Sequence, residues 1–241
     1  MNIHTFTLPA LFIAGTLVIS TSSLAADAVL QEDPTPPEPP VEESIEQSGW
    51  YIAARIGAAF ADDTSFTATG APINGSYDLG YSVSGAIGYD FKGNAPLSFR
   101  TELELGYLAL EIDQQNVVGT GTFSGANASG SSTALIGLVN AYVDYELGSI
   151  TPFATAGVGY ASLNFDNHRT TPTGVVMNDS DQGLAWQFGL GAAYAVTDTV
   201  KLDVGYRYMG IEDINLTATD ATQSSVDLRT HQIRLGIRKA F

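Results

Sequence analysis

The stretch HQIRLGIRKAF, residues 231–241, decides the fold because it alternates to the last residue of the chain. Ile233, Leu235 and Ile237 occupy every second position, and Arg234 lies between two of them. A period of two places these apolar side chains on one face of a β-strand and the polar ones on the other. The stretch ends on the aromatic Phe241 instead of a polar tail. We therefore expect a final strand with one face against an apolar medium.

The same alternation recurs from Gly49 onward. Long loops rich in Gly, Ser, Thr, Asn and Asp (62–76, 113–132, 164–183 and 212–225) alternate with short turns (92–96, 148–149 and 197–199). Antiparallel strands joined in this way have all tight turns at one end, as outer-membrane barrels do. The sequence predicts an all-β fold, an eight-stranded antiparallel up-and-down transmembrane β-barrel. The expected strands are 50–60, 77–91, 97–110, 133–147, 151–163, 184–196, 200–211 and 226–241.

The composition of the two strand faces separates this barrel from soluble alternatives. A soluble sandwich turns one face to water and fills it with Lys and Glu, whereas the less apolar face here is mainly Gly, Ala and Ser. A soluble lipocalin-like barrel also needs a charged exterior and lacks the asymmetry between turns and loops. Closure into a barrel pairs every backbone N–H and C=O group, which hydrocarbon requires.

Two segments precede the barrel, which we place at residues 49–241. Residues 8–19 are mostly apolar but too few to span a membrane, and Ser23 and Ala25 are small residues at the -3 and -1 positions of a cleavage site. Residues 1–25 are therefore a predicted signal peptide, cleaved between Ala25 and Ala26. Residues 26–48 combine prolines with acids, which predicts an extended, Pro/Glu-rich periplasmic linker.

Charge and cysteine content exclude several classes of function. The formal net charge is -16, which disfavours nucleic acid as a partner because phosphates need a basic surface. The chain has no cysteine, so it has neither a disulfide framework nor thiolate chemistry. The acidic loops show no EF-hand spacing. They indicate a solvated, repulsive surface or, as the other interpretation, carboxylates that share divalent ions with lipopolysaccharide phosphates.

Strand parity also assigns charged side chains to the barrel interior. Buried charges must be paired, so we expect arginines and carboxylates to form salt bridges in the turn-side half. Two interpretations remain, a polar plug that holds the barrel rigid and a narrow path for ions or water. The loop-side half is expected to form a water-filled cup lined by Gly, Ser and Ala. The predicted polar network comprises Arg55, Arg100, Glu102, Glu104, Asp144, Lys201, Asp203, Arg207, Arg234 and Arg238.

No catalytic, cofactor or metal site is predicted. Pairing with arginines accounts for Glu102 and Glu104, so a glycosidase carboxylate pair is not needed. His231 faces lipid near the outer interface by parity, and no serine follows it on the same face of its strand. Lipid-modifying barrels need a histidine, a serine and a carboxylate on one surface, so we expect the protein not to be an enzyme.

The signal peptide, the eight alternating strands, LDVGYRYMG (202–210) and RLGIRKAF (234–241) together resemble the small bacterial outer-membrane β-barrel superfamily. That group includes the OmpA membrane domain and the opacity-type surface proteins. The resemblance implies an outer-membrane monomer with extracellular long loops, in contact with lipid and lipopolysaccharide. It also implies that an insertion machinery reads the last strand, here through Ile233, Leu235, Ile237 and Phe241. OmpA-like proteins carry a peptidoglycan-binding domain after the barrel, and this chain ends with the barrel.

The predicted mature N-terminus suggests another link to the cell wall. Cleavage after Ala25 gives a chain that starts Ala26-Asp27, similar to barrels of this superfamily that are joined to peptidoglycan through the amino group. The alternative is a disordered leader without a role. We expect a structural, envelope-integrity and surface-interaction function. A small porin-like diffusion channel is the second hypothesis and a lipid A-modifying enzyme the third.

Overall fold

The computed structural model describes residues 49–68, 70–91, 96–171 and 174–241. The predicted signal peptide and linker, with Ala25 and Ala26, lie outside the described residues. One 3-10 turn, η1 (Gly125–Asn127), interrupts the strands, and no helix among the described residues is long and apolar enough to cross a membrane. The strands are β1 (Gly49–Ala61), β2 (Thr64–Ala68), β3 (Ala71–Tyr77), β4 (Gly80–Phe91), β5 (Leu97–Val117), β6 (Gly121–Ser124), β7 (Ala128–Tyr145), β8 (Ile150–Thr170), β9 (Gly174–Ala195), β10 (Val200–Thr217) and β11 (Gln223–Ala240).

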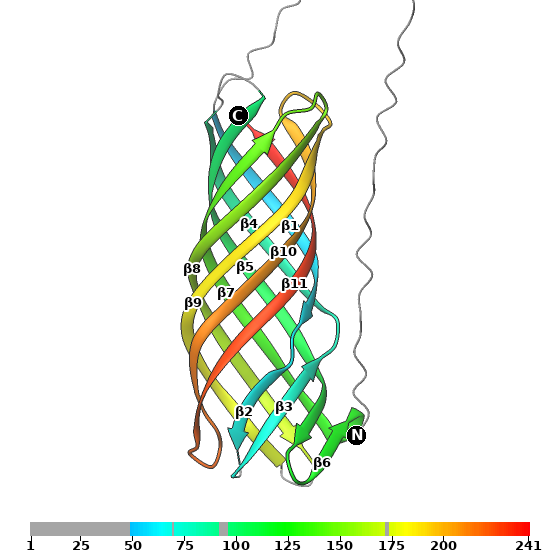
Figure 1. The fold of residues 1–241 in the computed structure, drawn as a ribbon, viewed down its shortest axis with the longest axis vertical. Helices are drawn as coiled ribbons and strands as arrows, with labels where there is room; N and C mark the ends of the chain where they lie inside the picture. Colours follow the sequence, from blue (N-terminus) through cyan, green and yellow to red (C-terminus); the bar gives the residue numbers. More distant parts are fainter. Residues whose placement is uncertain (1–48, 69, 92–95, 172–173) are drawn as a thin grey trace, which may run out of the picture. The chain divides into compact units, whose positions relative to one another are not determined.

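Eight of these strands form a closed antiparallel ring, which confirms the predicted barrel. The order is β1-β4-β5-β7-β8-β9-β10-β11, and β11 pairs back onto β1 (Figure 1). At the seam Ile56 lies opposite Leu235. The backbone N–H of Phe241 donates to the carbonyl of Trp50 at 3.1 Å. The last residue of the chain is therefore part of the closure between the first and last strands.

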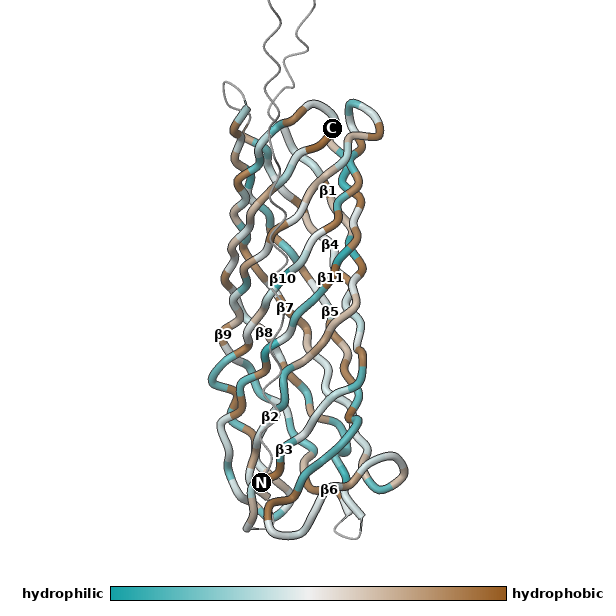
Figure 2. Tube along the Cα trace, turned by 45° about the vertical axis from the view of Figure 1, so that its right-hand side comes forward, coloured by the Kyte–Doolittle hydropathy of each residue, from teal (hydrophilic) through white to brown (hydrophobic). Residues whose placement is uncertain are grey.

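The outer wall of the turn-side half is apolar. Hydrophobic and hydrophilic residues alternate along the strands (Figure 2), and in this half the hydrophobic residues occupy the exposed positions. Ile233, Leu235, Ile237 and Phe241 are all exposed. Between Trp50 and Phe60, β1 has the length of about ten residues that a tilted strand needs to cross a bilayer.

Beyond the outer aromatic residues, the apolar positions of the strands point inward instead of outward. On β5, Leu103 and Leu105 are 60% and 61% exposed, whereas Leu108 and Leu110 are 1% exposed. Tyr107 marks the change, because the outward positions beyond it meet water and the inward positions pack on one another. On β10, Tyr206 faces outward, whereas Ile211 is buried beyond the same level. The strands therefore continue outside the membrane as a tube with a core of its own.

This outer tube corrects two expectations. The predicted loops are largely strand, because β5 runs to Val117, β8 to Thr170 and β9 starts at Gly174. The loop-side interior is not a water-filled cup. It is an apolar core, since the inward positions beyond the outer aromatic residues carry large hydrophobic side chains instead of the expected Gly, Ser and Ala. The core includes Phe66, Ile73, Leu108, Leu110, Leu138, Leu163, Phe165, Met177, Met209, Ile211, Ile214, Leu216 and Leu228.

In the outer tube, the hairpin of β2 and β3 continues the wall formed by β1 and β4, toward the bottom of Figure 1. β3 pairs with β5, which also pairs with β6. β2 meets β11 through a side chain, since the Ser224 hydroxyl accepts from the Thr67 N–H at 2.9 Å. Tyr77, at the end of β3, turns inward and hydrogen-bonds Thr64 and Ser132.

Candidate functional site

Two carboxylates on β5 organise the polar interior of the membrane-spanning half. Glu102 accepts two hydrogen bonds from Arg55, at 2.6 and 2.9 Å, and one from Arg100 at 3.0 Å. The hydroxyls of Tyr51 and Tyr142 donate to it at 2.9 Å each. The Arg100 guanidinium lies 3.7 Å from the centre of the Tyr142 ring, which adds a cation–π contact. These partners come from β1, β5 and β7, so the cluster links strands across one half of the ring.

Glu104, two residues further along β5, organises a second cluster. Arg207 donates to it at 2.9 Å, Arg234 at 2.8 Å and the Asn140 amide at 3.0 Å. Gln232 accepts from Arg207 at 2.7 Å. Glu104 is therefore shared by two guanidinium groups from β10 and β11, and its three charged or amide partners are buried.

The remaining predicted network residues lie toward the turn side. Asp144 accepts from Arg100 at 2.6 Å. Asp203 is 3.7 Å from Arg238 and 3.8 Å from Arg55. Lys201 is half-buried in the same inward row of β10. The structure thus brings the predicted cations and carboxylates into one interior region that runs from Glu104 toward the turns.

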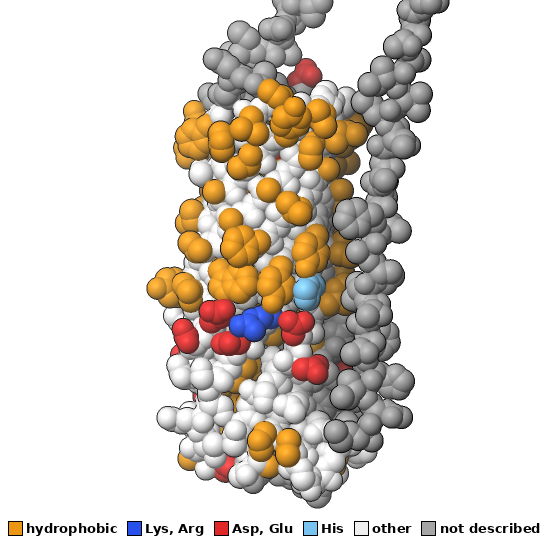
Figure 3. Space-filling model, in the orientation of Figure 1, with side chains coloured by type: hydrophobic (Ala, Val, Ile, Leu, Met, Phe, Trp, Pro, Cys, Tyr) orange, Lys and Arg blue, Asp and Glu red, His pale blue; other side chains and the backbone are white. Residues whose placement is uncertain are grey.

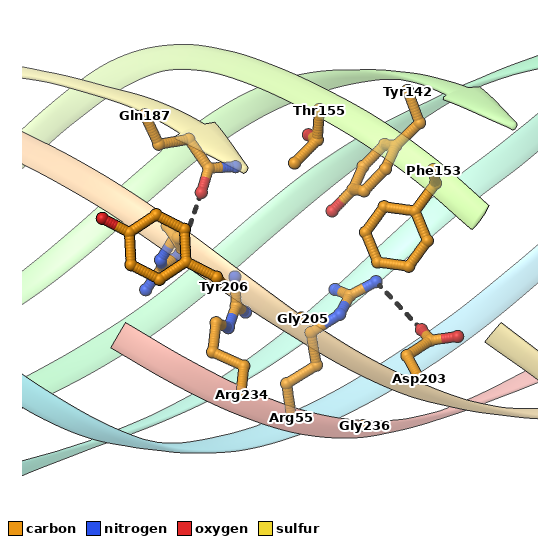
Figure 4. A pocket seen from close by; sticks show the side chains of 11 residues that line it. Arg55, Tyr142, Phe153, Thr155, Gln187, Asp203, Gly205, Tyr206, Arg234 and Gly236 are labelled. Atoms are coloured by element: carbon orange, nitrogen blue, oxygen red, sulfur yellow. Dashed lines mark hydrogen bonds and ion pairs between the residues drawn. The ribbon is translucent and has the colours of Figure 1, made fainter. Parts of the chain in front are cut away.

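A small cavity lies inside this network. Arg55, Arg234 and Gln187 line it together with Tyr142 and Asp203 (Figure 4). Its volume is about 30 Å³, room for about two water molecules. The lining includes the guanidinium groups of Arg55 and Arg234 and the carboxylate of Asp203.

A buried chain of polar side chains runs through the described part of the outer core. Ser132 joins the Tyr77 hydroxyl, at 3.2 Å, to His168 Nε2, at 3.1 Å. His168 packs against Phe165, with ring centres 4.8 Å apart, and is fully buried. Burial lowers the pKa of His168 to about 4, against the hydrogen bond to the Ser131 carbonyl and the nearby Asp166, which both raise it. The histidine is therefore neutral in the folded tube at ordinary pH.

The outer edge of the apolar band carries a row of charged side chains. Hydrophobic side chains cover the wall nearest the C-terminal end, and acidic side chains with a cation and a histidine follow directly beyond them (Figure 3). Tyr206 and His231 Nδ1 are 2.6 Å apart, and His231 Nε2 lies 3.5 Å from Asp62. Both ring nitrogens of His231 thus face a partner, a tyrosine hydroxyl on one side and a carboxylate on the other.

Sequence reasoning missed the outer core and the polar chain through His168. His168 was assigned to a long loop, although it lies on β8 inside the tube. The signal was present in the sequence as a change of phase. In LELGYLALEI (residues 103–112) the apolar positions move from odd to even numbers at Tyr107 and Leu108. Such a change predicts the point where a strand leaves hydrocarbon and enters water.

Comparisons with known proteins agree with this architecture. The outer membrane protein beta-barrel domain model matches residues 14–240. Outer membrane protein PagN of Salmonella typhimurium is 28% identical, with 81% of this chain and 91% of PagN covered. The 31 kDa outer-membrane immunogenic protein of Brucella melitensis is 26% identical, with 93% and 95% covered.

A solved structure shares the fold. The outer membrane protease OmpT from Escherichia coli superimposes with a TM-score of 0.50 at 9% identity, over 80% of this chain and 97% of OmpT. A likeness at this identity shows the fold alone, so the protease activity is not transferred. The closed ring of strands, the apolar outer wall and the family match agree, and the resemblance to small bacterial outer-membrane barrels is confirmed. The chain belongs to the outer membrane protein beta-barrel domain family, and its place is the bacterial outer membrane.

Proposed function

We propose that the protein is a sealed barrel that holds a rigid folded surface outside the outer membrane, in a structural and surface-interaction role. The observation that carries this proposal is the double closure of the interior. The Glu102 and Glu104 clusters fill the membrane-spanning half. An apolar core fills the outer tube. Both features block the interior, which a conducting protein needs open. Both also make the barrel rigid, which favours a protein that presents a surface.

The double closure also weighs against the porin-like alternative. Ions that entered the outer tube would have to displace buried groups such as Leu163, Phe165 and Met177, which are 0% exposed. Breaking a packed apolar layer and a paired charge network costs several kcal/mol for each buried group. The interpretation of the polar network as a rigid plug is therefore the one we propose.

The outer tube gives the surface role a physical basis. The connections at the outer end of the tube, among them residues 118–120 and 218–222, are here called the tips. The strands hold these tips beyond the outer aromatic residues on a packed core instead of on long loops. Surfaces held in this way bind a partner at a low entropic cost. The Brucella melitensis relative is described as immunogenic, which supports exposure of the corresponding surface in that protein.

Replacement of the tips tests the proposal. Residues 118–120 and 218–222 are each replaced by a short Gly-Ser connection, and cells are scored for adhesion, phage resistance and uptake of a small hydrophilic solute. We expect changed adhesion or phage sensitivity with unchanged uptake. A change confined to solute uptake would contradict the surface role and support a channel.

We also propose that the mature N-terminus is attached to peptidoglycan through Ala26. The supporting observations are the predicted cleavage site and the start Ala26-Asp27. β1 begins at the turn-side end of the barrel, which is the periplasmic end in this family of barrels. Digestion of the cell wall with lysozyme and trypsin should release muropeptides that carry the N-terminal peptide. A free N-terminus and no such muropeptides would refute the attachment.

A further inference from the structure

The polar interior contains more buried guanidinium groups than buried carboxylates. Arginine does not release its proton in proteins, so deprotonation cannot remove this excess of positive charge. Charged side chains of the interior that are only half-buried lie nearer the turns, where water screens them: Asp90, Glu146 and Lys201. In the described part of the membrane-spanning half, the fully buried groups are five arginines and four carboxylates: Arg55, Arg100, Arg207, Arg234, Arg238, Glu102, Glu104, Asp144 and Asp203.

The excess charge is localised at Glu104. Arg207 and Arg234 form ion pairs with this one carboxylate, at 2.9 and 2.8 Å. A buried charge without a counterion is costly, so a further anion beside these two guanidinium groups would stabilise the fold. The other buried groups balance one another within their own contacts, which join Arg55 and Arg100 to Glu102 and Asp144, and Arg238 to Asp203.

The cavity inside the polar network lies next to this excess charge. Arg207 and Arg234 both line it. Arg55 and Arg234 point into it from β1 and β11, and Thr155 points into it from β8 (Figure 4). The Thr155 hydroxyl is buried and has no hydrogen-bond partner among the described residues. The cavity therefore offers three guanidinium groups and one hydroxyl donor to an occupant.

Two glycines leave the room for this cavity. Gly205 on β10 lies opposite Arg234, and Gly236 follows two residues later in the same inward row of β11. A Cβ added at Gly236 would lie 2.8 Å from Cγ of Arg55, and one added at Gly205 would lie 3.5 Å from the Phe153 ring. Larger residues at these inward positions would fill the space. The sequence thus keeps a small polar space open beside the excess charge.

The size of the cavity selects the kind of anion. Its volume is about 30 Å³, room for about two water molecules. A chloride ion is only slightly larger than a water molecule and fits, whereas phosphate and sulfate carry four oxygens around a central atom and do not. The Asp203 carboxylate lies at the opposite end of the cavity from Gln187, which accepts from Arg207 at 3.4 Å (Figure 4). An anion is therefore held at the Arg207 end, away from Asp203.

We propose that the cavity binds one chloride ion, which Arg207, Arg234 and the Thr155 hydroxyl hold as the counterion of the excess guanidinium. The ion is a structural part of the polar plug. It gives no path across the barrel, because the apolar core of the outer tube lies beyond it. The site goes beyond the surface role proposed above and does not depend on it.

Urea unfolding in detergent tests this proposal when chloride replaces gluconate at constant ionic strength. Above the dissociation constant, a single site in the folded state raises the folding equilibrium constant about tenfold for each tenfold rise in chloride. Arg234→Met removes the excess cation and should abolish this dependence. Arg229→Met is the matched control, an exposed arginine on the same strand, and should retain it. No chloride dependence in the wild type, or an equal dependence in Arg234→Met, would overturn the proposal.

Bromide locates the ion directly. Crystals of the barrel grown in bromide should show an anomalous peak between Arg207, Arg234 and Thr155. Should Arg234→Met fail to fold, Thr155→Val is the second variant, since it keeps the shape of the side chain, and it should weaken chloride binding several-fold. An unchanged chloride affinity in Thr155→Val, or a cavity that holds water alone at high bromide, would contradict the site.

Discussion

Substitution of Glu104 by glutamine tests how far the polar interior stabilises the barrel. Glu104 receives charge-assisted hydrogen bonds from Arg207 at 2.9 Å and Arg234 at 2.8 Å. Each such bond contributes about 1.5–3 kcal/mol. The variant leaves two guanidinium groups buried without their anion, so we expect a loss of about 3–5 kcal/mol in the free energy of unfolding. For a chain of this size that corresponds to a fall of roughly 10 °C in the unfolding midpoint.

The assay is the temperature at which the folded band is lost in heat-modifiability gels, repeated by urea unfolding in detergent. Glu111→Gln, an exposed acid on the same strand, is the control and should change stability by less than about 0.5 kcal/mol. Arg234→Met added to Glu104→Gln should restore part of the loss, because it removes one of the unpaired cations. A Glu104→Gln midpoint equal to that of Glu111→Gln would refute the role of the paired charges.

Three further predictions concern the outer tube, the last strand and the outer interface. The pKa of His168 is about 4 in the folded tube, so the stability that its neutral form contributes is complete above about pH 6.5 and is lost as the pH falls toward 4. Hydrogen exchange of β8 and β9 should speed up over that window, and His168→Gln should remove the pH dependence. Phe241→Ala should lower insertion in cells more than folding in detergent, and equal insertion of both proteins would show that the aromatic end is dispensable. Incubation with lipopolysaccharide should release no fatty acid by mass spectrometry, because no serine follows His231 on the same face of its strand, and release that Asp62→Asn abolishes would contradict this.

The barrel was predictable because membrane strands show a simple alternation. One face of each strand meets hydrocarbon and the other meets the polar interior. In stretches such as residues 231–241, the residue type therefore indicates whether each side chain points outward or inward. The distribution of short turns and long connections then fixed the antiparallel order. The charged residues of the interior also followed from parity, since Glu102 and Glu104 lie between outward-facing leucines on β5.

The outer tube was not predicted, and the reason is physical. Beyond Tyr107 the solvent changes from hydrocarbon to water, so the apolar positions move to the inside and the outside becomes polar. Polar outward residues such as Ser180 and Gln182 then resemble loop residues, although they lie on β9. The partners of single residues, such as Ser132 with His168, depend on the distance between strands far apart in the sequence and could not be predicted.

Planar-bilayer recording tests the central claim, that the interior is sealed, most directly. The purified barrel is reconstituted at low density, and current is followed at both polarities with the Glu104→Gln variant beside it. The double closure predicts no stable, reproducible conductance steps for the wild-type protein. Large, stable steps of uniform size from the wild type would contradict the sealed barrel and identify a channel.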